Sequence, residues 1–516
     1  MKKALALLMA LSMLLLLCAC GGVLGTKDVV SFENTSVAGQ IDEEGTLYLS
    51  PVTDTAVKIM GDHARASISP DRQKAVVLEQ DGQLTLFPQF PEPEGKVTIA
   101  SEVASIISVK DTCALYTDKE DVVHRYFYAD GTDMALGKQA GYYLEGSQLL
   151  YASDGKIFLL PADATEPEKI GSYESYVSLG LKAVSKNGEN AIWCIEDGKD
   201  ITVYLYENGE KLKLGTMTLS SSYGVSRAMF DRSGSCAVAY SLWADVLYLK
   251  PAGQEPIKYR LPNEPASGPY TINGPFSLDE SGSIRGLYIL VEGEKSSSLY
   301  YLDDQGEREK LLSGIEEMDI CNGQLFYIDE DDTLFCAKLD GATVGDPARI
   351  ASSVDLFDVP YNGDCVYYLK NCDDSEGSLY VYRVGDKEPT KISSGVGIIR
   401  YSWSDTIYSN YRISTDGKTV YYFKDMETDV GDTYLDIGTL YRYTYGDKES
   451  VKISSDVVTG SLSSGLTPGA IDPKSFMYMR YLSAGADRSG NTAIYANWVF
   501  YNGADSTVVA KDVIVD

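Results

Sequence analysis

The residue types that enzymes use for nucleophilic and acid–base chemistry are scarce or scattered in this chain of 516 residues. Only two histidines occur, His63 and His124, and a Ser-His-Asp or Cys-His site would need one of them. The position of each histidine beside a predicted turn or strand favours a structural role. G-x-S-x-G, H-E-x-x-H, P-loop and G-x-G-x-x-G motifs are absent. We therefore expect no identifiable catalytic residue, no bound metal and no cofactor.

Carboxylates are abundant, and three groups of them are dense. These groups are DD (303–304), DEDD (329–332) and CDDSEG (372–377), and each falls at a predicted hairpin turn. The EF-hand pattern, with its glycine at the sixth position, is absent, so solvated turns explain these groups better than calcium loops do. Paired acids for glycoside cleavage stay open as an alternative, but the sequence does not place them.

One stretch combines aromatic residues with small polar ones. It reads RYSWSDTIYSNYRI (400–413) and contains Tyr401, Trp403, Tyr408 and Tyr411. Aromatic faces beside Ser, Asp and Asn side chains are suited to stacking on a sugar or a peptide. The competing interpretation is an ordinary inner strand of a sheet. We take these four aromatic residues as the weak ligand-binding candidates of the sequence.

The first residues have the pattern of an export signal. A positive start precedes an apolar run over 4–17, which is too short to span a bilayer comfortably. The segment LCAC (17–20) resembles the bacterial lipobox, whose cysteine carries diacylglycerol after the preceding peptide is removed. This resemblance implies a signal peptide at 1–19, a lipid anchor on Cys20 and a tether at 20–30, at the extracytoplasmic face of a bacterial membrane. The alternative is an ordinary secretory signal that happens to end in cysteine.

Charge and cysteine content narrow the possible partners. The formal net charge of −30 repels duplex nucleic acid, so we expect no nucleic-acid partner.

The seven cysteines outside the lipobox show no C-x-x-C spacing, and we expect free thiols buried in strands. Cys321 and Cys336 are not expected to form a bridge, because a hairpin turning at 329–332 would place Cys336 opposite Leu325.

The elements that must position these residues are short strands in a repeated unit. GSLYVYRVGDKEPTKISSGV (377–396) and GTLYRYTYGDKESVKISSDV (438–457) share 13 of 20 residues, and each alternates with period two before a turn. Weaker relatives recur along the chain, and a polar turn followed by another strand precedes most of them. Units of about four strands, repeated without helical periodicity, indicate an all-β fold of the β-propeller type.

The turn of this unit resembles that of the TolB-type propeller repeat. Ser69-Pro70-Asp71 and the stretch STDG (414–417) match its Ser-Pro-Asp-Gly turn best, and a Leu-Tyr strand follows later in the unit. The resemblance also extends to propeller lipoproteins without an assigned role. About ten four-stranded units follow one another along the chain, and the proline-rich stretch 251–275 favours two rings, at 31–262 and 271–516 with a joint at 263–270. One large ring is the alternative.

These observations favour a non-catalytic binding or scaffold protein held at the membrane through Cys20. Its partner would be an envelope protein, a peptide or an envelope glycan, because a rigid propeller presents a loop-rich face. The alternative is a carboxylate-dependent polysaccharide hydrolase or lyase. A purely structural partner of an envelope complex is a third interpretation.

Overall fold

The computed structural model describes most of residues 39–515. The residues outside the described part are 1–38, 42–46, 50–51, 53, 55–56, 60–62, 91, 93, 163, 165, 175–176, 220–225, 232–233, 242–243, 245, 262–264, 270–275, 279–283, 294–295, 374, 401–406, 431–434, 463–469, 473, 487–491 and 516. The predicted signal, Cys20 and the tether therefore lie outside the described residues. Within the described part, no helix is long and apolar enough to cross a membrane.

Antiparallel sheets follow one another along the chain, and three of them have four strands in chain order. Their strands are rich in aromatic and β-branched residues, which favour extended backbone. These strands are β4 (His63–Ile68), β5 (Ala75–Glu79), β6 (Leu84–Phe87), β7 (Val97–Ala100), β15 (Ser178–Val184), β16 (Ala191–Asp197), β17 (Asp200–Glu207), β18 (Glu210–Thr218), β19 (Ser226–Phe230), β20 (Ala237–Ser241), β21 (Val246–Lys250) and β22 (Ile257–Arg260).

Three long strands join one four-stranded unit to the next. β11 (Asp133–Glu145) pairs with β10 (Val122–Phe127) through its first half and with β12 (Gln148–Ser153) through its second. β27 (Arg308–Cys321) and β35 (Thr390–Arg400) behave in the same way. The remaining strands of these sheets are β8 (Val103–Val109), β9 (Cys113–Asp118), β13 (Lys156–Leu160), β14 (Glu168–Ser172), β23 (Pro265–Pro269), β24 (Phe276–Leu278), β25 (Ile284–Val291), β26 (Ser297–Asp303), β28 (Gln324–Asp329), β29 (Leu334–Asp340), β30 (Thr343–Val344), β31 (Ala348–Ala351), β32 (Val354–Asp358), β33 (Cys365–Lys370), β34 (Glu376–Arg383) and β36 (Ile407–Ser409).

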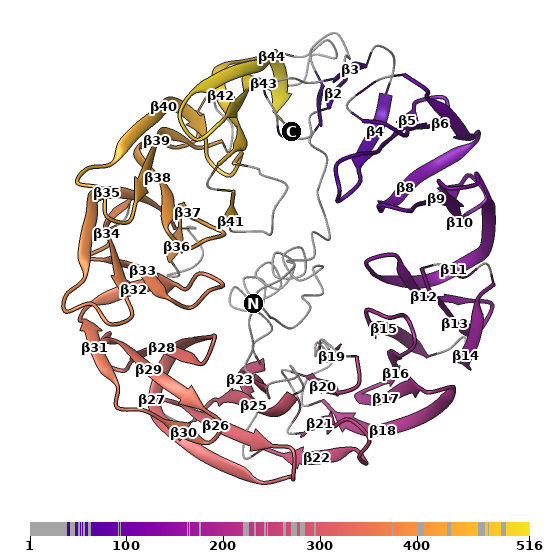
Figure 1. Cartoon of the computed structure of the whole chain (residues 1–516), viewed down its shortest axis with the longest axis horizontal. Coiled ribbons are helices and arrows are strands. Elements are labelled where there is room, and N and C mark those ends of the chain that lie inside the picture. The colour runs from indigo at the N-terminus through magenta and orange to yellow at the C-terminus, as the bar shows by residue number, and fades with distance from the viewer. Residues whose placement is uncertain are drawn as a thin grey trace.

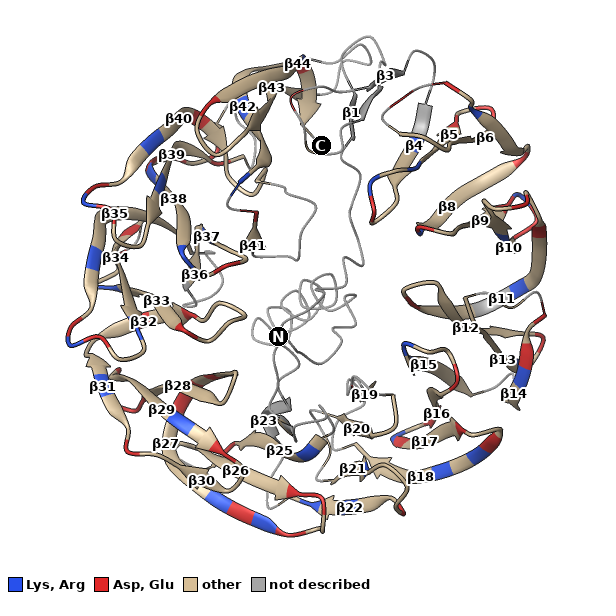
Figure 2. Ribbon diagram, viewed as in Figure 1, with Lys and Arg blue, Asp and Glu red and all other residues tan. Residues whose placement is uncertain are grey.

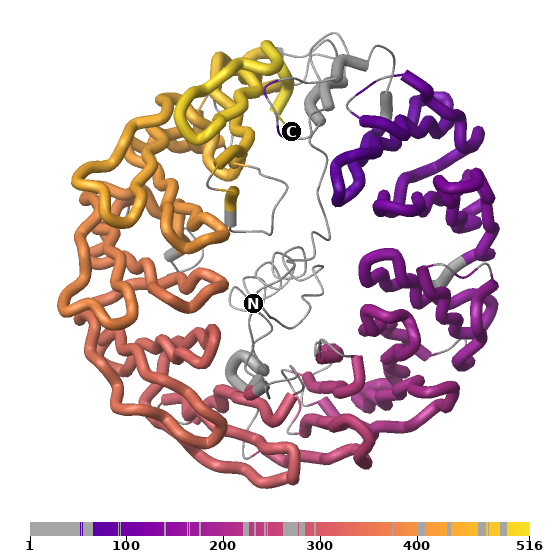
Figure 3. The backbone as a smooth tube through the Cα atoms, viewed as in Figure 1, coloured from indigo at the N-terminus to yellow at the C-terminus, as the bar shows by residue number. Residues whose placement is uncertain are grey.

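The two ends of the described chain lie side by side. The last sheet is formed by β37 (Tyr411–Ser414), β38 (Thr419–Glu427), β39 (Ile437–Thr444), β40 (Val451–Val458), β41 (Ala470–Ile471), β42 (Phe476–Ala486), β43 (Thr492–Tyr501) and β44 (Ser506–Val515). The first sheet is formed by β1 (Gly39–Ile41), β2 (Leu47–Leu49) and β3 (Val57–Ile59), and β1 contacts β44. Val52 packs in one apolar cluster with Trp498 and Val513. Figure 3 traces the backbone from the indigo N-terminal side of the ring to the yellow C-terminal strands.

Figure 1 shows the sheets placed one after another around a common axis. In a unit such as β15–β18, the first strand lies nearest the axis and the last strand lies at the rim. Four-stranded antiparallel sheets arranged radially in this way define a β-propeller. The described chain is thus an all-β propeller protein, as the repeats predict.

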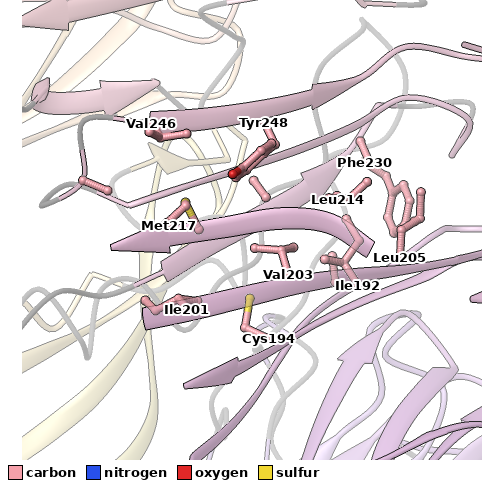
Figure 4. Packing of buried hydrophobic residues seen from close by; sticks show 14 of the residues in the cluster. Ile192, Cys194, Ile201, Val203, Leu205, Leu214, Met217, Phe230, Val246 and Tyr248 are labelled. Carbon is pink, nitrogen blue, oxygen red and sulfur yellow. The ribbon is translucent and has the colours of Figure 1, made fainter. Parts of the chain in front are cut away.

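The apolar core lies between successive sheets. Val203 and Leu205 on β17 face the following sheet, where they pack in one cluster with Phe230 and Tyr248 (Figure 4). Trp193 on β16 packs on the preceding sheet. Because the middle strands are covered on both faces, their sequences are apolar at nearly every position rather than at alternate ones.

A buried serine holds the polar turn between the first two strands of several units. Ser69 is fully buried; its hydroxyl donates to Asp71 Oδ1 at 2.5 Å and accepts from the Lys74 backbone N–H at 3.0 Å. Ser185 and Ser414 make the corresponding pair of hydrogen bonds in their own turns. The serine of the repeated turn therefore satisfies buried backbone groups, which is a structural role.

Lysine and arginine, interspersed with aspartate and glutamate, lie on the rim of the propeller, where the last strand of a unit has an unpaired edge (Figure 2). Charged side chains on an edge strand prevent pairing with another chain. Protection of the edge strand explains the lysine of the repeated KIS sequence. The exposed rim residues are Lys169, Lys211, Lys213, Lys258, Arg260, Arg308, Lys310, Arg349, Lys391, Lys452 and Lys511.

The cysteines confirm one prediction and correct another. All seven cysteines of the described part are free, and only Cys372 is not fully buried. The predicted register of the β28–β29 hairpin is wrong by one residue, because Cys336 lies opposite Phe326 and not opposite Leu325. The reason is the turn, in which Asp329 Oδ1 accepts the backbone N–H groups of two later residues and lengthens the loop.

Candidate functional site

The aromatic residues predicted from sequence do not form one surface in the described part. Tyr401 and Trp403 lie outside the described residues. Tyr408 on β36 is 44% exposed, whereas Tyr411 on β37 is 3% exposed and packs in the core. Only Tyr408 is therefore both described and accessible. Cys20 also lies outside the described residues.

A cleft lies elsewhere, between the sheet that ends in β14 and the sheet β15–β18. Its volume is about 540 Å³. One wall comes from the segment that follows β14, and the other comes from β16, β17 and β18. The lining residues are Ser172, Tyr173, Glu174, Val177, Ile195, Asp197, Asp200, Thr202, Tyr204 and Thr216.

Local sequence explains why these side chains reach the cleft. In β17 the residues alternate, so Ile201 and Val203 enter the core while Thr202 and Tyr204 face the cleft. Asp197 and Asp200 flank the turn between β16 and β17. Gly198 adopts a φ of 62° there, which glycine reaches without steric cost.

Tyr204, which lines the cleft, belongs to an aromatic stack with the buried Trp193. The rings of Tyr204 and Trp193 are stacked, with centroids 5.6 Å apart and planes inclined by 19°. Lys211 Nζ lies 4.1 Å from the Tyr204 centroid and 5.5 Å from that of Trp193. Burial lowers the pKa of Lys211. The hydroxyls of Thr202 and Thr216 are 3.1 Å apart on the same face.

The charged side chains that line the cleft are all acidic. Glu174 and Asp197 are exposed, and Asp200 accepts a hydrogen bond from the Thr218 hydroxyl at 2.7 Å. Within the described residues, none of these three carboxylates forms an ion pair with lysine or arginine. The cleft therefore combines aromatic faces and hydroxyls with unneutralised negative charge.

His124 belongs to a separate polar cluster on β9, β10 and β11. Its ring stacks on Tyr116, with centroids 4.9 Å apart. His124 Nε2 lies 3.3 Å from Asp118 Oδ2, and Nδ1 lies 3.2 Å from Asp133 Oδ2. Both ring nitrogens thus face carboxylates, and neither is directed toward a nucleophile. This arrangement supports the structural role that the sequence favours.

Carboxylates of neighbouring inner strands form a second acidic group near the propeller axis. Burial raises the pKa of Glu317 and of Asp319, both on β27, to about 7, and the negative charge of Asp358 on β32 adds to both shifts. Burial also raises the pKa of Asp358, although Tyr411 and Arg412 on β37 act in the opposite direction.

Solvent contact moderates this second acidic group. Glu317 is exposed and Asp319 is partly exposed, so water screens their charges even though the surrounding protein disfavours ionisation. Burial raises the pKa of the Tyr411 hydroxyl, and the negative charge of Asp358 adds to this shift. However, Asp358 Oδ2 and the Tyr411 hydroxyl are both buried without a well-formed hydrogen bond among the described residues. We therefore describe the pair as an electrostatic contact.

No three His, Cys, Asp or Glu side chains of the described part are grouped so that they could hold a metal ion. Neither the cleft nor the group around Glu317 was found from sequence. The lining tyrosines occupy ordinary strand positions of the repeat, so nothing in a single unit marks them. An acidic turn with an aromatic residue in the adjoining strand, as at 197–204, is the one signal that could have indicated the cleft.

Comparison with known proteins assigns neither a family nor a function to this chain. No family model matches the chain, and no curated protein matches it. A crystal structure of a eukaryotic initiation factor is similar at a TM-score of 0.42 and 9% identity, over 81% of this chain and 96% of the other.

Two further solved structures are similar at lower scores. The tricorn protease has a TM-score of 0.33 and 12% identity, over 92% of this chain and 58% of its own. Dipeptidyl peptidase 4 of Porphyromonas gingivalis has a TM-score of 0.36 and 9% identity, over 71% of this chain and 65% of its own. Similarities this weak do not transfer the activities of those proteins to this chain.

Proposed function

We propose that this chain is a membrane-anchored extracytoplasmic lipoprotein that acts as a non-catalytic binding or scaffold module for a protein, a peptide or an envelope glycan. The observation that carries the binding role is the cleft between β14 and β15–β18. Concave sites with aromatic walls and a few polar groups are the usual places where small ligands and short segments bind. The lining contains no His, Cys or Lys, so it lacks the usual base for nucleophilic catalysis.

The binding role is tested by removing one wall of the cleft. Tyr173→Ala deletes a partly exposed ring outside the core strands, so the fold should survive. We expect this variant to lose binding to the peptides or envelope glycans that the soluble domain selects from arrays. Tyr408→Ala is the matched variant for the aromatic stretch predicted from sequence. If only Tyr408→Ala reduces binding, the functional surface is that stretch and not the cleft.

The anchor is supported by the lipobox resemblance around Cys20 and is tested separately from the cleft. Cys20→Ala should move the protein from the membrane fraction to the soluble fraction, because acylation at this residue would no longer occur. Metabolic labelling with a palmitate analogue should disappear in the same variant. Retention in the membrane fraction would show that the lipobox interpretation is wrong.

We also infer that the repeats are TolB-type units, about ten in number, in one continuous ring. The contact of Val52 with Trp498 supports a single ring, as does the order of the sheets around one axis in Figure 1. The serine turns at Ser69 and Ser414 support the TolB-type unit. Small-angle scattering should then give the profile of one wide, flat particle. Two separate maxima in the distance distribution would favour two rings at 31–262 and 271–516.

The group around Glu317 supports an alternative function, a carboxylate-dependent polysaccharide hydrolase or lyase. Acids with a pKa near 7 are suited to proton transfer at neutral pH. Turnover of labelled envelope glycans that is lost in both Glu317→Gln and Asp319→Asn would favour this alternative. If the parent protein shows no turnover and both variants bind as the parent does, the binding module remains the proposed function.

A further inference from the structure

We propose that the Asn208-Gly209 turn is a modification site, at which the folded protein converts asparagine to aspartate or isoaspartate without an enzyme. The sequence contains six Asn-Gly pairs, and five of them lie in the described part of the chain. The pair at 273–274 lies outside the described residues. The contacts of the five described pairs separate Asn208 from the other four asparagines.

This deamidation joins the backbone nitrogen of the glycine to the side chain of the preceding asparagine. The nitrogen attacks Cγ, the bond from Cγ to Nδ2 breaks, and ammonia leaves with the proton of the backbone N–H. Water then opens the cyclic imide at either carbonyl, which gives aspartate or isoaspartate with no change of oxidation state. Because a carboxamide or an N–H group that is held in hydrogen bonds must first release them, such hydrogen bonds slow the reaction.

Asn208 is free to react at the tip of the β17–β18 hairpin. It has a φ of 54° and Gly209 has a φ of 82°, as in the tight turn that Asn-Gly favours between two strands. Both residues are exposed. Among the described residues, neither the Asn208 side chain nor the Gly209 backbone N–H has a hydrogen-bond partner. Apart from the chain neighbours, no described atom lies within 4 Å of the position that a Cβ on Gly209 would take.

The side chains of two other asparagines are held in hydrogen bonds. Asn187 Nδ2 donates to Glu189 Oε2 at 2.6 Å, and Asn187 Oδ1 accepts from the Ser185 hydroxyl at 2.6 Å. Asn322 Nδ2 donates to the backbone carbonyl of Asn362 at 2.8 Å. Attack on either Cγ therefore has to break at least one of these hydrogen bonds.

The remaining two asparagines are held in the same way. Asn362 Nδ2 donates to the Asp416 backbone carbonyl at 3.1 Å. Asn502 Oδ1 accepts the backbone N–H groups of Ala504 and Asp505 at 2.9 and 2.7 Å. The glycines after these four asparagines are also crowded, since a Cβ on each would lie 3.2 Å or less from another atom. These glycines are Gly188, Gly323, Gly363 and Gly503.

The product places a new charge beside a contact between two sheets. Glu207, directly before the turn, pairs with Lys250 Nζ on β21 at 3.1 Å, and Glu210 directly follows the turn. A carboxylate at position 208 adds a third negative charge between these two acids. The isoaspartate form also lengthens the backbone of the turn by a methylene, which no longer fits the tight two-residue connection.

The test uses the parent protein. The folded full chain and a guanidinium-unfolded sample are incubated at mildly alkaline pH, and peptide mapping by mass spectrometry follows each Asn-Gly pair with time. The pairs should react at similar rates in the unfolded sample, because no hydrogen bond of the fold remains. In the folded protein, we expect Asn208 to react at least about threefold faster than each of the other four, since each of those must break a hydrogen bond.

Asn208→Asp is the matched control for the assignment. Asp-Gly favours the same turn, so the variant should fold, and its 207–210 peptide should show no further mass gain. The proposal is overturned if Asn208 reacts no faster in the folded protein than the other four asparagines. It is also overturned if the fold slows all five described pairs equally, or if the early mass gain of the folded protein persists in Asn208→Asp.

Discussion

The unit β15–β18 and the unit β8–β11 build the same three-layer stack of side chains, but they place the charge in different layers. In the first unit, Trp193 and Tyr204 are cross-strand partners whose rings stack, and Lys211 from the rim strand covers Tyr204. The two inner layers are neutral, and the outer layer is a cation. Figure 2 shows lysines in blue on the rim strand of this unit, β18.

The second unit repeats this geometry with different chemistry. Tyr116 and His124 are cross-strand partners whose rings stack with planes only 8° apart. The third layer is Asp133, which occupies the position in β11 that Lys211 occupies in β18. Asp133 also accepts a hydrogen bond from the Tyr116 hydroxyl at 2.7 Å. Here the middle layer can carry the positive charge, and the outer layer is an anion.

The difference teaches that the repeat fixes where a planar side chain must lie, whereas the residue type decides what that position does. His124 fills an aromatic position of the repeat, which explains a histidine that otherwise has no role. Tyr204 fills the same position beside the cleft, with Trp193 stacked on its ring and Lys211 covering it. The same backbone thus gives a closed polar cluster in one unit and a candidate binding surface in another.

The largest expected effect comes from the innermost layer of the first stack. Trp193 is 0% exposed, so Trp193→Ala should lower the free energy of unfolding by about 3–5 kcal/mol through lost burial and a cavity. Urea unfolding of the purified domain measures this change. Trp193→Phe keeps a ring for Tyr204 and should cost clearly less. Equal costs for the two variants would show that stacking contributes nothing to this layer.

A smaller effect should come from exchanging the charge pattern of the second stack for that of the first. His124→Tyr alone leaves Asp118 and Asp133 without the imidazole, and Asp133→Lys alone places an ammonium beside His124. Each single variant should lose about 0.5–1.5 kcal/mol of unfolding free energy. The double variant should recover about 0.5–1 kcal/mol, because it recreates a tyrosine–lysine contact.

A double-mutant cycle gives this coupling energy directly. Strict additivity of the two single variants, within about 0.3 kcal/mol, would mean that the two stacks are not equivalent positions of one repeat. Asp331→Lys serves as the control for a general effect of added positive charge on this acidic chain, because Asp331 lies exposed in a turn of another unit.

The two stacks should also respond differently to acid. Desolvation acts to raise the pKa of Asp118, but hydrogen bonds from the Val122 and Glu120 backbone N–H groups and from His124 outweigh it, and the net pKa is lowered. A carboxyl whose folded-state pKa is lowered contributes stability above the unfolded value of 3.8, and this contribution is lost as pH falls through the folded pKa. The stack of Trp193, Tyr204 and Lys211 contains no carboxylate.

Hydrogen exchange measures this difference locally. After correction for intrinsic rates, the β9–β10 hairpin should lose protection more steeply than the β16–β17 hairpin as pH falls below about 4. Asp118→Asn should abolish the steep part, since the asparagine does not titrate. Parallel loss of protection in both hairpins would show that acid acts on the whole sheet surface and not on this stack.

Sequence reasoning found the repeated unit but not what the unit carries at each position. The two copies at 377–396 and 438–457 are hairpins of neighbouring sheets, in which Leu379 and Leu440 are fully buried and Tyr380 and Tyr441 stack on inner aromatic residues. Period two and turn residues are local signals, so they predicted these elements. The cleft depends on the spacing between two sheets, which no single unit encodes.

The smallest expected effect concerns the outer layer of the first stack. Lys211 is exposed on the rim strand, so Lys211→Gln should lower the free energy of unfolding by only about 0.5–1 kcal/mol, the usual worth of an exposed cation–π contact. Lys213→Gln, on the same strand and without a ring contact, is the matched control and should be close to neutral. The effect of Lys211→Gln on stability should be compared with its effect on ligand binding. Removing Lys211 uncovers one face of the Tyr204 ring, so binding of the peptides or glycans that the parent domain selects from arrays should rise while stability falls slightly. A fall in both would mean that Lys211 supports the shape of the cleft and does not compete for its ring.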